Sequence, residues 1–262
     1  MTQPAAPIPT PTRPVPRYRL GNFPVDGAGF ARTLELVTGW VGGEPFRQIV
    51  TPNVDNVILL QNNPDFLKAY EASALSLADG KPILWAARYL GLPPLEKVSG
   101  SDLLPELCRR GDAARWRVYL VGGRDEPELA LLMGNIGRRF PGLSLGGIWP
   151  PFGFERDAAE SARIVEAIRQ FAPELLLFGC GAPKSEVWMA RHAGELGRGV
   201  GLNVGAGLRM LAGLERRAPR WMQWIGLEWF WRLAREPRRL WRRYLINDVQ
   251  FFPLVWRWKH TK

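Results

Sequence analysis

Cysteine and histidine are scarce in this chain of 262 residues, which has only Cys108, Cys180, His192 and His260. Two cysteines exclude a disulfide framework and a cysteine-rich zinc site. Two histidines leave little for histidine-based metal binding or for a histidine-dependent catalytic triad. So few cysteines fit a protein of the reducing cytosol.

Long apolar runs are also absent. No segment approaches the ~20 predominantly apolar residues that a membrane-spanning helix needs. Residues 1–16 lack the positive start and the continuous apolar centre of a signal peptide, and six of them are proline. We therefore expect 1–16 to be an extended, disordered arm.

Two motifs of nucleotide and phosphate binding are missing. The chain has no Asp-x-Asp and no G-x-x-x-x-G-K-[ST]. These absences argue against a paired-carboxylate metal cradle for a nucleotide diphosphate and against a Walker-type NTPase. If the protein binds a diphosphate, its own cations must neutralise it, and guanidinium groups do this in bidentate fashion.

Positive charge is concentrated at the C-terminal end. Residues 216–262 contain 12 Lys plus Arg and three acids, a net charge of +9, whereas the remaining residues contain 23 and 22, a net charge of +1. The same segment holds seven of the 12 tryptophans. We interpret the near-neutral body as the part that does chemistry and the basic tail as a part that meets an anionic surface.

Three interpretations of this tail are open from the residues alone. It could be a solvated basic helix pair without function, a single-strand nucleic-acid binder, or a membrane-surface anchor. Tryptophan favours the water–lipid interface and basic residues favour anionic head groups, so membrane docking is preferred by a small margin. A helix from Pro219 to about Ala234 and a second, basic amphipathic helix from Pro237 are expected there.

The body alternates short apolar runs with stretches of helical spacing. Continuous apolar strands joined by helices are typical of a parallel sheet that is covered on both faces. We therefore predict an α/β fold, a Rossmann-like doubly wound and mostly parallel sheet over 17–215, with a helical appendage over 216–262. The expected strands are 47–51, 73–78, 116–121, 143–149, 175–179 and 200–204, and the expected helices are 54–70, 126–140, 157–171 and one that begins at Pro183.

Ligands of such sheets bind beyond the C-terminal ends of the strands. Asp79 follows the apolar run 73–78, where partial desolvation raises a carboxyl pKa toward a useful general-base range. Asp79-Gly80 is equally typical of a simple turn. Glycines at the other strand ends let backbone N–H groups approach an anion, although each can serve only to turn the chain.

An ordered set of motifs resembles one enzyme family, the WecG/TagA/CpsF glycosyltransferases (glycosyltransferase family 26). The resemblance covers about residues 18–245. The motifs are Thr51-Pro52-Asn53, Ala78-Asp79-Gly80-Lys81-Pro82, Lys97-Val98-Ser99-Gly100-Ser101-Asp102-Leu103, the segment 179–188 (GCGAPKSEVW), Val204-Gly205-Ala206, Ala212-Gly213, Arg217-Ala218-Pro219, Gly226-Leu227-Glu228-Trp229 and the segment 232–239 (RLAREPRR).

The resemblance implies an inverting glycosyltransferase without a cofactor or metal. Such an enzyme moves N-acetylmannosamine, a hexose or a uronic acid from a UDP-sugar to a polyprenyl-diphosphate-linked saccharide in bacterial surface polysaccharide biosynthesis. It would lie in the cytoplasm, bound peripherally to the inner face of the plasma membrane through 216–262, with no nucleic acid as partner. The alternative is a non-catalytic membrane- or nucleic-acid-binding protein on a Rossmann-like body.

Residue roles also follow from the resemblance. Asp79 looks like the catalytic base that accepts the proton of the acceptor hydroxyl. The remaining candidates would bind substrate, with the appendage arginines closing over the diphosphate. Those within the family motifs or the appendage are Thr51, Asn53, Lys97, Gly181, Pro183, Ser185, Gly205, Arg209, Arg232, Arg238 and Arg243, and Gly122 and Gly123 join them because they are glycines at the end of an expected strand.

Three positions depart from the family pattern. Lys97 stands where the family usually has Arg, Ser185 where it usually has Gln, and Arg209 where it usually has Asp. The last change reverses a charge near the expected donor site. We hypothesise that Arg209 pairs with an anionic donor sugar, such as a uronic acid, or with the diphosphate.

Overall fold

The computed structural model of the protein describes residues 15–261. Most of the arm expected at 1–16 lies outside the described residues. Among the described residues, no helix combines the length and the apolar character that crossing a bilayer requires.

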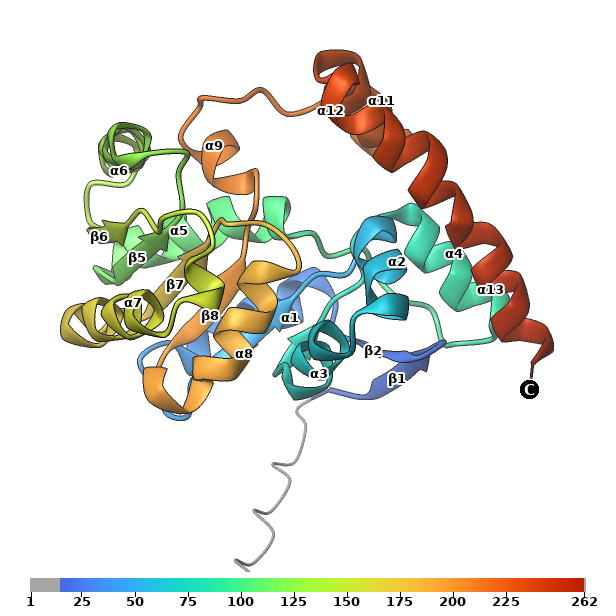
Figure 1. Ribbon diagram of the computed structural model, residues 1–262, viewed down its shortest axis with the longest axis horizontal. Coiled ribbons are helices and arrows are strands. Elements are labelled where there is room, and N and C mark those ends of the chain that lie inside the picture. The colour runs from blue at the N-terminus through green and yellow to red at the C-terminus, as the bar shows by residue number, and fades with distance from the viewer. Residues whose placement is uncertain (1–14, 262) are drawn as a thin grey trace, which may run out of the picture.

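A six-stranded parallel sheet forms the centre of the molecule (Figure 1). Its strand order is β4-β3-β8-β7-β5-β6. The step from β3 to β4 and the step from β5 to β6 therefore extend the sheet in opposite directions, as in a doubly wound fold. The predicted Rossmann-like, mostly parallel sheet is confirmed. The strands are β3 (Arg47–Val50), β4 (Leu75–Ser76), β5 (Arg117–Val121), β6 (Ser144–Ile148), β7 (Leu175–Phe178) and β8 (Val200–Asn203), with β1 (Arg17–Leu20) and β2 (Phe23–Asp26) in a separate antiparallel hairpin.

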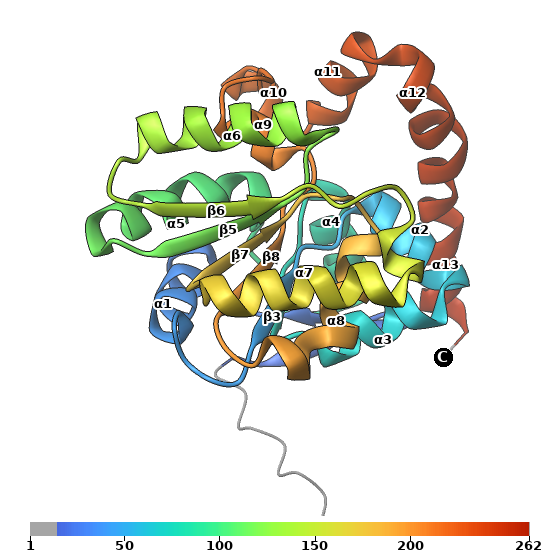
Figure 2. The same cartoon turned by 60° about the vertical axis from the view of Figure 1, so that its left-hand side comes forward.

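Helices cover both faces of this sheet (Figure 2). On one face, α1, α5 and α6 pack against alternate strand residues in the largest apolar cluster. On the other, α7 and α8 pack on β5 and β7, and α2, α3 and α4 pack beside the hairpin. The helices of the body are α1 (Phe30–Trp40), α2 (Val54–Asn62), α3 (Pro64–Ala72), α4 (Lys81–Tyr89), α5 (Gly100–Ala114), α6 (Glu126–Arg139), η1 (Phe154–Arg156), α7 (Ala158–Phe171), α8 (Lys184–Leu196) and α9 (Gly207–Leu211).

The single helix predicted over 54–70 is wrong. The chain forms α2 and α3 instead, because the Asn63 side chain accepts a hydrogen bond from the Phe66 N–H and Pro64 occupies the first helical position. Both features start a new helix, and the proline also disfavours a helical conformation at Asn63. The strand predicted over 73–78 is shorter as well, with regular pairing only at Leu75–Ser76.

The C-terminal segment is helical, as predicted, but divided differently. The expected helix 219–234 is two helices, since Gly226 adopts a left-handed conformation (φ +86°) at the end of the first. The elements are α10 (Arg220–Ile225), α11 (Glu228–Arg235), α12 (Pro237–Arg242), η2 (Arg243–Asn247), η3 (Asp248–Gln250) and α13 (Phe251–His260).

The last helix of the appendage shares an apolar cluster with the body. Phe251, Leu254 and Val255 of α13 are buried with side chains of the β1–β2 hairpin, α2 and α3, and Trp258 packs against them. Figure 1 shows α12 and α13 descending along the side of the molecule that carries α2 and α4. The boundary at residue 216 stays a prediction.

Candidate active site

Asp79 lies at the C-terminal edge of the sheet, directly after β4. The backbone follows β3 beyond the regular strand, with hydrogen bonds from Leu77 N–H to the Val50 carbonyl (2.9 Å) and from Asp79 N–H to the Pro52 carbonyl (3.0 Å). Gly80 then takes φ +101° and begins α4. This geometry holds the Asp79 carboxyl next to the end of β3. Asp79-Gly80 can therefore form a turn and also place Asp79 as a general base.

The carboxyl of Asp79 is held in an unusual electrostatic environment. Burial raises its pKa from 3.8 to about 7. The charges of Lys97 and Arg232 act to lower this pKa, and those of Glu228 and Asp102 act to raise it. Asp79 therefore has the basicity that a general base needs near neutral pH.

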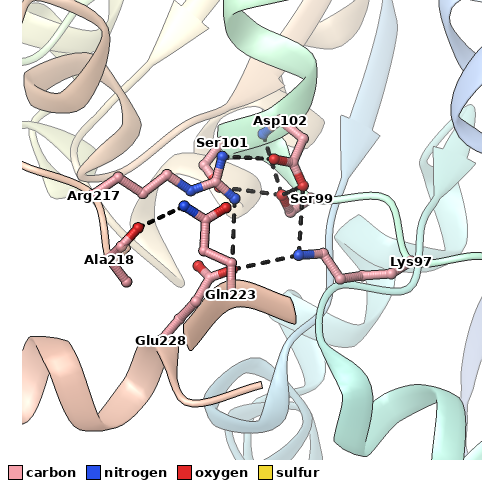
Figure 3. A network of polar contacts seen from close by, with 8 residues as sticks. All are labelled: Lys97, Ser99, Ser101, Asp102, Arg217, Ala218, Gln223 and Glu228. Atoms are coloured by element: carbon pink, nitrogen blue, oxygen red, sulfur yellow. Dashed lines mark hydrogen bonds and ion pairs between the residues drawn. The ribbon is translucent and has the colours of Figure 1, made fainter. Parts of the chain in front are cut away.

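Beside Asp79, charged residues of the body and the appendage form one network (Figure 3). Lys97 Nζ lies 3.5 Å from Asp102 Oδ2 and 3.4 Å from Glu228 Oε1. Arg217 Nη1 lies 2.6 Å from Asp102 Oδ1, and Arg217 Nη2 lies 3.6 Å from Glu228 Oε1. The four residues alternate in sign, and they attach the start of the appendage to the body at the sheet edge.

Asp102 accepts the shortest hydrogen bonds of this network. Ser99 is the N-cap of α5, and its hydroxyl donates to Asp102 Oδ2 at 2.6 Å. Burial by itself raises the pKa of Asp102, but the hydrogen bonds from Arg217 and Ser99 hold that pKa below its ordinary value. Asp102 is therefore ionised at neutral pH and fixes the orientation of the Arg217 guanidinium.

Thr51 and Asn53 lie at the end of β3, on the strand that neighbours Asp79. Asn53 is the N-cap of α2, and its side-chain oxygen accepts a hydrogen bond from Asn56 N–H at 3.1 Å. Thr51 is partly buried. The structure brings both predicted residues to the Asp79 end of the edge, and gives Asn53 a structural task as well.

The predicted glycines lie farther along the same edge. Gly122 and Gly123 follow β5 with φ of +154° and +101°, and a Cβ on Gly122 would meet the Gly179 backbone at 3.3 Å. Gly181 and Gly205 follow β7 and β8 in left-handed conformations. Four strand spacings of about 4.8 Å separate β4 from β5, so roughly 19 Å of sheet edge lies between Asp79 and Gly122. Only an extended ligand could contact both.

The helix predicted to begin at Pro183 is α8, with Pro183 as its N-cap. Ser185 is buried, and its hydroxyl donates to the Gly181 carbonyl at 3.2 Å. The next residue, Glu186, is also buried, and burial raises its pKa to about 7. Ser185 thus serves the helix start, and the acid beside it faces the interior.

The four arginines that were predicted to bind substrate have different surroundings. Arg232 of α11 is the one whose charge acts on Asp79. Arg209 forms ion pairs with Glu128 of α6 and with Glu215, the latter at 3.6 Å. Arg243 pairs with Asp55 at 3.1 Å, and Arg238 is exposed. The pairing of Arg209 with an anionic donor stays a prediction.

Sequence reasoning quoted Asp102, Arg217 and Glu228 within motifs but assigned them no role. The sequence feature that could have indicated them is the presence of oppositely charged residues in three separate motifs. Within residues 15–261, no group of three or more His, Cys, Asp or Glu side chains is arranged to hold a metal ion.

The comparison with protein families decides the affiliation. Residues 18–262 match the Glycosyl transferase WecG/TagA/CpsF family. The chain belongs to this family. The resemblance carried by the motifs is thereby confirmed, and the protein is a glycosyltransferase of polysaccharide biosynthesis.

Members of the WecG/TagA/CpsF family with curated names are similar over most of the chain. A protein of Staphylococcus aureus (strain MW2), named N-acetylglucosaminyldiphosphoundecaprenol N-acetyl-beta-D-mannosaminyltransferase, is 25% identical over 194 residues, which are 74% of each chain. A protein of the same name from Bacillus spizizenii is 25% identical over 197 residues, 75% of this chain and 74% of its own.

Proposed function

We propose that this glycosyltransferase moves a sugar from a UDP-sugar to a polyprenyl-diphosphate-linked saccharide, with inversion at the anomeric carbon. N-acetylmannosamine is the first donor sugar to test, since the named relatives are N-acetylmannosaminyltransferases. A hexose or a uronic acid is the second choice. The names of these relatives also favour N-acetylglucosaminyldiphosphoundecaprenol as the acceptor.

The observation that carries the proposal is the Asp79 carboxyl, which has a pKa of about 7 and lies at the sheet edge beside Lys97 and Arg232. Asp79 accepts the proton of the acceptor hydroxyl, and the oxygen attacks the anomeric carbon from the face opposite UDP. The bond from that carbon to the UDP oxygen breaks, and the electron pair leaves with UDP. The nearby cations stabilise the negative charge that grows on the leaving diphosphate.

The appendage is proposed to dock on the cytoplasmic face of the membrane, where a lipid-linked acceptor is presented. Its exposed surface combines aromatic rings with basic side chains, which suits an anionic lipid interface. Its large exposed apolar side chains are Trp221, Ile225, Trp229, Phe230, Trp241, Leu245, Ile246, Val249, Phe252 and Trp256.

The substitution Asp79→Asn tests the base directly. We expect kcat to fall about 10²- to 10⁴-fold with little change in UDP affinity, because the amide keeps the shape but does not accept the proton. UDP release is measured over a panel of UDP-sugars with a short-chain lipid-diphosphate N-acetylglucosamine acceptor.

Asp65→Asn is the matched control, since Asp65 forms surface ion pairs on α3 and such pairs contribute little. Full activity of Asp79→Asn, or a loss confined to UDP binding, would refute the base role. No release of UDP from any UDP-sugar by the wild-type protein would refute the proposed donor class.

A further inference from the structure

Arg217 presents an unused hydrogen-bonding edge beside Asp79. Its Nη1 is held by Asp102, whereas Nε and Nη2 are buried and make no hydrogen bond in the described part of the chain. These two N–H groups form the side-on fork with which a guanidinium binds two oxygens of a phosphate or a carboxylate. An oriented, buried fork of this kind is costly unless a ligand uses it.

Glu228 forms an ion pair with Nη2 of this fork, and its contacts are long. Its Oε1 lies 3.6 Å from Arg217 Nη2 and 3.4 Å from Lys97 Nζ, compared with 2.6 Å for the contact between Arg217 and Asp102. A single carboxylate oxygen therefore stands between two cations without a short, well-formed hydrogen bond to either. Figure 3 shows Glu228 approaching both cations from the appendage side.

We propose that Lys97 and the Arg217 fork form a diphosphate cradle, and that Glu228 occupies it as an internal anion which the diphosphate displaces. Asp102 and Ser99 are positioning residues, since they orient Arg217 from the opposite side. Glu228 lies on α11 together with Arg232, so its displacement exchanges one anion for another while the helix stays beside Asp79. The inference rests on the proposed function, which supplies the diphosphate.

The ligand chemistry has two sources in the proposed reaction, the UDP part of the donor and the lipid diphosphate of the acceptor. Both offer adjacent phosphoryl oxygens that match the spacing of a guanidinium fork. The cradle therefore predicts competition between Glu228 and whichever diphosphate binds there.

The variant Glu228→Gln keeps the shape of residue 228 and removes its charge. Isothermal titration calorimetry on the full chain should give about three- to tenfold tighter binding of inorganic pyrophosphate, because the competing charge is gone. Separate titrations with UDP and with a short-chain prenyl diphosphate show which source uses the cradle, since only the ligand that binds there gains affinity. Glu236→Gln, which makes the same charge change on a half-exposed residue of the appendage, should change each Kd less than about twofold.

Unchanged or weaker binding of all three probes by Glu228→Gln would overturn the proposal. Arg217→Lys gives a second test, because lysine keeps the charge opposite Asp102 and loses the fork. We expect about tenfold weaker pyrophosphate binding by this variant, and an affinity equal to that of the wild type would also overturn the proposal. Turnover distinguishes the two hypotheses: tighter binding by Glu228→Gln without any UDP release by the wild type supports the cradle and refutes the proposed function.

Discussion

At the scale of single residues, burial raises the pKa of four carboxyl groups in the described part of the chain, and two of these pKa values reach about 7. The pKa values of Asp79 and Glu186 are both raised to about 7. Asp79 lies among charged side chains at the sheet edge, whereas Glu186 is buried on α8 with its Oε2 unpaired within the described residues. We therefore assign the chemistry to Asp79.

The raised pKa of Asp79 predicts a distinct pH profile. A general base works only when it is deprotonated, so kcat/KM should fall about tenfold per pH unit below pH ~7 and level off above it. An ordinary aspartate, with a pKa near 3.8, would leave the rate flat from pH 5 to 8.

Initial rates of UDP release between pH 5 and 9 measure this profile. Glu186→Gln serves as the control, because it removes the other acid with a pKa near 7 and should retain the break. A flat profile in the wild type, or loss of the break in Glu186→Gln, would contradict the assignment to Asp79.

At the scale of elements, the N-terminal caps of two helices lie at the candidate site. Asn53 caps α2 and Ser99 caps α5, and these two helices begin on either side of Asp79 in the chain. Asn53 therefore combines a structural hydrogen bond with a predicted contact to substrate.

Two substitutions separate these roles of Asn53. Asn53→Ser keeps a good cap, and its free energy of unfolding should stay within about 0.5 kcal/mol of the wild type, whereas Asn53→Ala should lose about 1 kcal/mol. Both remove the amide, so both should raise the KM for a substrate that contacts it. Urea unfolding and steady-state kinetics provide the two readouts, and wild-type kinetics in Asn53→Ser would limit the residue to its cap.

At the scale of the whole molecule, the appendage both completes the core and presents an exposed aromatic and basic surface. Truncation near residue 216 would remove Leu240, Phe251, Leu254 and Val255, which are buried. Such a truncation would destabilise the fold and would also remove any membrane contact. Surface substitutions are therefore the better test of docking.

We expect the quadruple variant Trp241→Gln, Phe252→Ser, Arg242→Gln and Arg257→Gln to bind anionic vesicles at least about tenfold more weakly. Each basic residue near an anionic surface contributes about 1 kcal/mol, and the rings add interfacial affinity. Sedimentation with phosphatidylcholine–phosphatidylglycerol vesicles measures the partition coefficient. Phe152→Ser with Arg138→Gln, an exposed ring and base of the body, is the control. Equal binding of the quadruple variant and the wild type would contradict docking through this surface.

Local sequence features were enough to predict the parallel α/β class, the position of Asp79 after an apolar run, and the basic helical appendage. Each follows from local properties: continuous apolar strands, glycine-rich strand ends, and residues such as Pro183 and Pro237 that begin helices. Even there, Asn63 and Gly226 divided helices that periodicity alone predicted to be continuous.

Which charged side chains contact one another depends on the tertiary structure. Lys97 and Glu228 are 131 residues apart in the chain, and Asp102 and Arg217 are 115 residues apart. No periodicity links such positions, because their proximity depends on how the appendage packs against α2 and the hairpin. The raised pKa of Asp79 was likewise decided by tertiary structure, since burial and four charges from distant segments act on it at once.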